Sequence, residues 1–177
     1  MTIFDVQVVK NPGPTLLFEV DDRTTTSVTA TIKPGEPVKT YSSNQYVIPL
    51  LTGDPEIATD NFVGITHKES TETSSANGNV EVTLAMPMQT ILRAKATTTT
   101  NVNTVAKILA YKNDAVCFDV TASSGTNGIF TIDEDQTADP NVNGLIIFDG
   151  DPIDFTLDVF VHPNVTLFAS LTGQTMD

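Results

Sequence analysis

The 177-residue chain is long enough to bury a single core, and its 40% hydrophobic and 18% charged residues exclude the intrinsically disordered class. Its net charge of -13 opposes direct binding to nucleic acid, because phosphate backbones are bound by neutralising their charge with Lys and Arg. Cys117 is the single cysteine, which excludes an internal disulfide and favours a reducing compartment.

The first 27 residues are predicted to form an extended N-terminal arm, followed by a β-rich domain over residues 28–177. The segment alternates apolar patches with the break NPGP and has no partner strand nearby in the sequence. Because such an arm supplies no core strand, removal of residues 1–14 is expected to leave the β domain folded. The sequence also shows no signal-peptide pattern and no run near the ~20 apolar residues of a membrane span, so no membrane association is predicted.

Short runs with the two-residue period of β-strands follow along the chain. TTTSVTATI at 24–32 and NVEVTLAM at 79–86 place their apolar side chains on one face. Gly and Pro mark turns between the runs, which favours a compact antiparallel β barrel or sandwich-like domain. Further strands are predicted at Tyr46–Leu51, Phe62–Thr66, Thr90–Ala96, Val116–Thr121, Ile129–Ile132, Leu145–Phe148 and Phe155–Val161.

One short helix is predicted within NVNTVAKILAYKND, residues 101–114. Either Asn103 or Thr104 is suited to cap its start. The apolar side chains that fall on one side of this helix are Val102, Val105, Ile108 and Leu109.

Few residues suggest catalysis. His67 and His162 are the only imidazoles, and neither lies in a nucleophile motif or has a second histidine at ligand spacing. Cys117 lies between apolar neighbours, as a buried thiol would. The sequence therefore predicts no catalytic residue, no cofactor and no enzymatic activity.

Two loops are rich in acids, DEDQTAD at 133–139 and DGDPID at 149–154. Hard cations favour such oxygens, but DGDPID lacks the longer EF-hand frame with its closing Glu. A solvated acidic turn is expected at each loop, and no metal site is predicted. A hydrolase that uses these loops is an alternative, which would require activity to be lost on Asp149→Ala or Asp151→Ala.

Four stretches of the chain resemble the capsid decoration, or cement, proteins of tailed bacteriophages. They are PGEPV at 34–38, the GD turn followed by FVGIT at 62–66, VEVTLAMP at 80–87 and FTIDEDQTADPNVNGLIIFDGD at 130–151. The resemblance implies a structural homotrimer that is made in the host cytoplasm and binds the outer surface of the expanded head in the virion. There it would bridge neighbouring major capsid proteins and stabilise the shell against the internal pressure of the DNA.

The capsid contacts are expected in residues 1–27 and at the turn around Gly53–Asp60. The alternative is a receptor- or carbohydrate-binding β module of a phage tail or surface structure, which would need an exposed aromatic cluster or a metal site. The candidate contact residues are Phe4, Val6, Val8, Pro12, Pro14, Leu16, Asp54 and Glu56.

Overall fold

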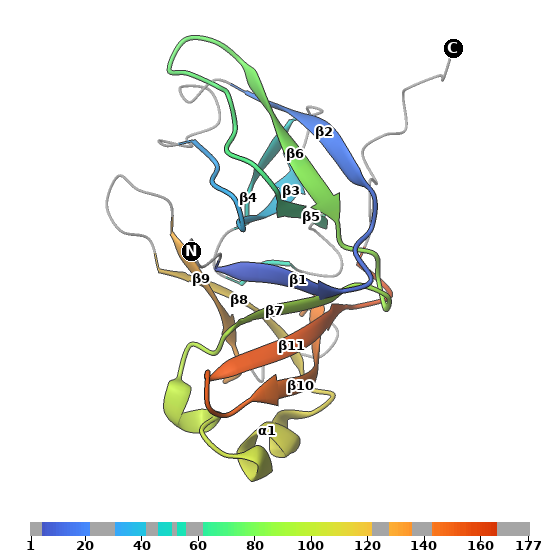
Figure 1. Ribbon diagram of the computed structural model, residues 1–177, viewed down its shortest axis with the longest axis vertical. Helices are drawn as coiled ribbons and strands as arrows, with labels where there is room; N and C mark the ends of the chain where they lie inside the picture. The colour runs from blue at the N-terminus through green and yellow to red at the C-terminus, as the bar shows by residue number, and fades with distance from the viewer. Residues whose placement is uncertain are drawn as a thin grey trace.

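The computed structural model describes residues 5–21, 31–41, 46–50, 53–55, 62–121, 128–135 and 143–165, and it confirms the mainly β fold. Two antiparallel sheets follow one another along the long axis of the molecule (Figure 1). The larger sheet has the strand order β1 (Val6–Lys10), β7 (Ile91–Lys95), β11 (Thr156–Val161), β10 (Leu145–Asp151), β8 (Ala115–Thr121), β9 (Ile129–Asp133). The smaller sheet has the order β2 (Thr15–Val20), β6 (Gly78–Leu84), β5 (Phe62–Thr66), β3 (Pro37–Thr40), β4 (Val47–Pro49).

Each sheet curls so that strands far apart in its order come together. In the larger sheet, Ala96 forms a parallel bridge with Ile132 of β9, and the Thr97 N–H donates to the Ile132 carbonyl at 2.9 Å. In the smaller sheet, Glu19 of β2 forms a parallel bridge with Tyr46, which precedes β4. This curling agrees with the predicted barrel or sandwich-like domain.

The two sheets enclose two hydrophobic clusters, which share strand β5. The large core lies within the larger sheet and receives Phe62 and Ile65 of β5, whereas the small core receives Val63. Gly64 lets β5 lie close to β6, because a Cβ atom there would stand 2.1 Å from the Thr83 carbonyl oxygen. The strand is buried along its whole length and joins the two halves of the molecule.

The expected N-terminal arm is wrong for residues 5–21. Strand β1 pairs with β7, and β2 pairs with β6 over its full length. Val6 and Val20 are only 1% and 2% exposed, and they belong to the large and small cores respectively. Between the strands, the Gly13 N–H donates to the Leu84 carbonyl at 3.1 Å. These residues are therefore part of the β domain, while the predicted boundary between residues 27 and 28 lies outside the described residues.

The predicted strands from residue 46 onward correspond to the eight strands β4 to β11. Strand β5 has the predicted bounds, and β10 extends three residues further than predicted, to Asp151. The alternation in β6 is also confirmed, because Val80, Val82 and Leu84 are buried. Most of the strand predicted at 24–32 lies outside the described residues, and β3 was not predicted.

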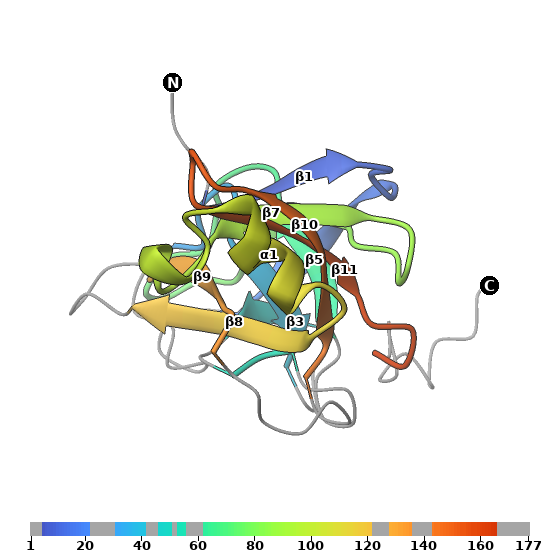
Figure 2. The ribbon, with the colours of Figure 1, turned by 90° about the horizontal axis from the view of Figure 1, so that it is seen from below.

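The predicted helix is α1 (Val105–Tyr111), preceded by the 3-10 helix η1 (Thr99–Asn101). The Thr104 side chain caps α1 by accepting the Lys107 N–H at 3.3 Å. Seen from below, α1 covers the end of the larger sheet (Figure 2). The four apolar side chains expected on one side divide into two pairs, since Val102 and Ile108 are buried whereas Val105 and Leu109 are exposed.

Candidate interaction surfaces

The candidate contact residues of the N-terminal segment divide by exposure. Val6 lies inside the large core, and the partly buried Val8 packs against that core. Pro12, Pro14 and Leu16 are exposed at the corner where β1 leads into β2. Of the described candidates in this segment, only these last three are exposed.

Asp54 is buried and forms an ion pair within the fold. It is 8% exposed, and one of its carboxylate oxygens lies 2.8 Å from the Lys39 ammonium. Its backbone carbonyl also accepts the Phe118 N–H at 2.7 Å, which ties this turn to β8. The side chain is therefore not available as a surface contact. Phe4 and Glu56 lie outside the described residues.

Strand β2 stands at an edge of the smaller sheet and exposes apolar side chains. Leu16 is 43% exposed and Leu17 is 64% exposed. The Asn11 side-chain amide donates to the Gln89 carbonyl at 3.1 Å, which brings the β1–β2 corner against the loop that holds the exposed Met88. An apolar edge strand is a site where another chain can pair or pack. Leu16 and Leu17 point to opposite faces of β2, because Leu16 pairs with the buried Val82 and Leu17 with Glu81. We call the exposed apolar residues around this edge strand and its corner the N-terminal edge; they are Val9, Pro12, Pro14, Leu16, Leu17 and Met88.

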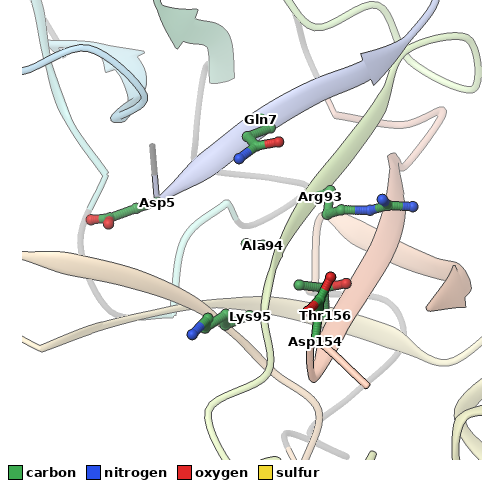
Figure 3. A pocket seen from close by; sticks show the side chains of 7 residues that line it. All are labelled: Asp5, Gln7, Arg93, Ala94, Lys95, Asp154 and Thr156. Carbon is green, nitrogen blue, oxygen red and sulfur yellow. The ribbon is translucent and has the colours of Figure 1, made fainter. Parts of the chain in front are cut away.

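A shallow hollow of about 360 Å³ lies on the larger sheet beside β1 and β7 (Figure 3). Arg93 and Lys95 contribute basic groups, and Asp5 and Asp154 contribute acidic ones. Asp5 also accepts the Phe130 N–H at 3.2 Å, and burial raises the pKa of its carboxyl. The lining contains no aromatic ring, so the hollow offers no stacking platform for the carbohydrate-binding alternative. Its lining residues are Asp5, Gln7, Arg93, Ala94, Lys95, Asp154 and Thr156.

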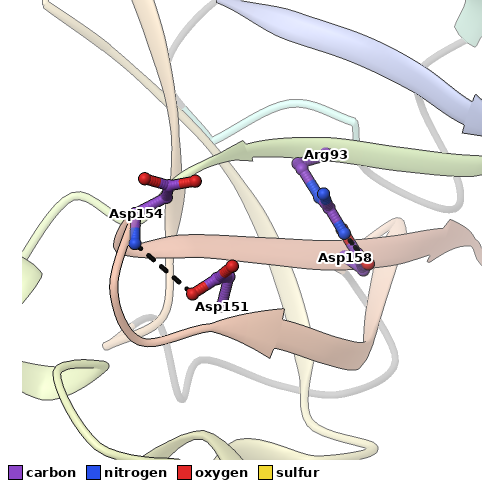
Figure 4. A network of polar contacts seen from close by, with 4 residues as sticks. All are labelled: Arg93, Asp151, Asp154 and Asp158. Carbon is purple, nitrogen blue, oxygen red and sulfur yellow. Dashed lines mark hydrogen bonds and ion pairs between the residues drawn. The ribbon is translucent and has the colours of Figure 1, made fainter.

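The acids near β10 and β11 stabilise the fold locally (Figure 4). Asp158 holds Arg93 in a two-point ion pair, with distances of 2.6 Å to Nε and 2.7 Å to Nη2. The Asp151 carboxylate closes the β10–β11 turn by accepting the Ile153 N–H at 2.8 Å and the Asp154 N–H at 3.4 Å. Within the described ranges, no group of three or more His, Cys, Asp or Glu residues is placed to hold a metal ion.

The first acidic loop contains a buried carboxylate. Glu134 is 1% exposed, and it accepts the Thr98 N–H and the Asn101 side-chain amide, both at 3.1 Å. The same amide lies 2.8 Å from an oxygen of Asp135. Burial raises the pKa of the Glu134 carboxyl. This part of the loop therefore anchors η1 to β9, while Asp139 lies outside the described residues.

Each histidine has a local contact. His67 is exposed, and its backbone N–H donates to the Glu81 carbonyl at 2.8 Å. His162 Nδ1 accepts the Asn164 N–H at 3.1 Å, and burial lowers the pKa of its imidazole. Cys117 is buried, as its apolar neighbours predicted.

No family model matches the chain, and no curated protein matches it. Across the parts of the chain that the structure covers, no helix is long and apolar enough to cross a membrane.

Proposed function

We propose that this chain is a structural decoration protein of a tailed-bacteriophage head. It binds the outer surface of the expanded head as a homotrimer and bridges neighbouring major capsid proteins. The observation that carries the proposal is the N-terminal edge, where Leu16 and Leu17 are exposed on an edge strand. Covering apolar surface is favourable by about 25 cal/mol per Å², and an edge strand can also pair its backbone with another chain.

The attachment of the N-terminal edge to both sheets suits a bridging role. Strand β1 belongs to the larger sheet and β2 to the smaller one, so a load applied at their corner is shared by both halves of the domain. The net charge of -13 favours the outer face of a head over its DNA-facing interior. Three linked copies would also bind more tightly than one copy, because the later contacts form within the same complex.

The test mixes purified protein with expanded and unexpanded heads that lack it. Binding stoichiometry and the temperature of DNA release are measured for each form. We expect saturable binding to expanded heads and a higher release temperature. Failure of the wild-type protein to bind either form would remove the proposal.

A matched pair of variants tests the N-terminal edge. Leu17→Asn replaces an apolar side chain that is 64% exposed, so the fold is expected to persist while binding to expanded heads weakens at least tenfold. Ser74→Asn alters an exposed loop residue away from this edge and is expected to bind as the wild type does. Equal binding by both variants would place the capsid contact elsewhere.

A further inference from the structure

The outward face of α1 is apolar, which is unusual for a surface helix. Ile108 is the one buried residue among its seven, and Lys107 is its one charged residue. A helix packed on a sheet normally turns polar side chains outward. Here the outward positions are apolar, with Val105 at 62% and Leu109 at 57% exposure beside Ala106 and Ala110.

Two lysines flank this apolar face. The Lys107 ammonium donates to the Thr100 carbonyl at 2.6 Å and to the Asn103 side-chain oxygen at 3.1 Å. The Lys112 ammonium lies 5.4 Å from the centre of the Phe148 ring. Neither lysine forms an ion pair with an acid in the described part of the chain. We call this surface the helix face; it comprises Val105, Ala106, Lys107, Leu109, Ala110 and Lys112.

The β10–β11 turn has the opposite charge around an apolar tip. Ile153 is 83% exposed at this tip. The adjacent Asp154 is exposed, and no described residue forms an ion pair with it, while Asp151 fixes the turn through two backbone N–H groups. We call residues 151–154 the acidic turn. It lies at the same end of the molecule as α1 (Figure 1).

We propose that the acidic turn of one copy docks on the helix face of a second copy, with Ile153 packing between Val105 and Leu109. In this arrangement, Lys107 and Lys112 of one copy face Asp151 and Asp154 of the other. Charge complementarity favours a second copy as the occupant, because each copy carries both halves of the contact. The local lysine–aspartate attraction also offsets the repulsion between two chains of net charge -13.

The contact joins two different patches, so it is heterologous. Such a contact builds a closed ring when the rotation between copies divides the full circle, and a trimer is one such ring. The inference therefore rests on the homotrimer of the proposed function and specifies the surfaces that form it. The N-terminal edge is left free for the capsid.

Sedimentation velocity of the full chain without heads tests the interface. We expect the wild type to self-associate and Ile153→Asp to weaken that association at least tenfold. Ile153 is so exposed that the variant should fold, which circular dichroism checks, and Leu109→Asn tests the opposite patch independently. Ser74→Asn, at an exposed loop residue outside both patches, is the control and should associate as the wild type does.

A charge exchange tests the pairing of lysine with aspartate. Lys112→Glu alone should weaken association, and adding Asp154→Lys should restore it. A wild type that stays monomeric up to about 100 µM, or an Ile153→Asp variant that associates normally, would overturn the inference. If the chain is monomeric but still binds heads, this interface is wrong and the proposed decoration role still holds. If the chain forms a ring that binds no heads, the decoration role is wrong and this interface still holds.

Discussion

Asp54 and Lys39 form an ion pair that is largely withdrawn from water, with side chains 11% and 16% exposed. Lys39→Ala would leave the Asp54 carboxylate without its ammonium partner, and we expect a loss of about 2–3 kcal/mol in the free energy of unfolding. The matched control is Lys68→Ala, since the Lys68–Glu81 pair is 65% and 34% exposed and should contribute less than about 0.5 kcal/mol. Urea denaturation measures both, and equal losses would contradict the structural role of Asp54.

Glu134 makes stability depend on pH, because burial raises the pKa of its carboxyl above the usual 4.5. The folded chain therefore holds this proton more tightly than the unfolded chain does. The resulting stabilisation is complete below about pH 4.5 and is lost as the pH rises through the folded-state pKa. We expect Glu134→Gln to show a smaller decline in unfolding free energy than the wild type over this window, measured by urea denaturation at a series of pH values.

A substitution of Asn101 should change the pH dependence due to Glu134 in the opposite direction to Glu134→Gln. Its side-chain amide donates to Glu134 and so opposes the effect of burial on the Glu134 pKa. Asn101→Ala should therefore raise that pKa further and extend the pH range over which stability falls. Burial raises the pKa of Asp5 as well, so some decline should persist in Glu134→Gln. A steeper decline in Glu134→Gln than in the wild type would contradict this account.

Strand β1 is the element whose role differs most from the sequence-based expectation. Val6 is 1% exposed in the large core, whereas Val9 on the same strand is 40% exposed. We expect Val6→Ala to reduce the free energy of unfolding by about 1–3 kcal/mol and Val9→Ala to change it by less than about 0.5 kcal/mol. Thermal and urea denaturation of the two variants measure these changes.

Removal of residues 1–14 takes away all of β1 and should therefore destabilise the domain. A truncated chain as stable as the wild type would instead support the predicted N-terminal arm.

The strands from β4 onward could be predicted because their apolar residues alternate or cluster between Gly and Pro turns. Strand β3 could not, since it begins at Pro37 within the turn signature PGEP. Strands β1 and β2 pair with β7 and β6, which lie far along the chain, and local pattern does not reveal such partners. The same limit applies to contact residues: the burial of Val6 and Asp54 depends on distant partners. On α1, a regular period predicts Val105 on the same side as Ile108, but Ile108 is the one buried residue of this short helix and Val105 is 62% exposed.

The whole molecule is joined by β5, which places Phe62 in the large core and Val63 in the small core. In the proposed bridging role the chain would carry load between its two halves, and a shared strand would transmit that load directly. Because β5 cannot leave one core without disturbing the other, the two cores should unfold together. This expectation applies to the chain in solution, whatever its partner.

Calorimetry tests this coupling. We expect one transition whose calorimetric and van't Hoff enthalpies agree. Val82→Ala in the small core and Leu157→Ala in the large core should each shift that single transition, by about 2–4 °C for every kcal/mol lost. Two transitions, each moved by only one of these variants, would show that the cores are independent. In that case β5 would be a flexible link between two halves that unfold separately.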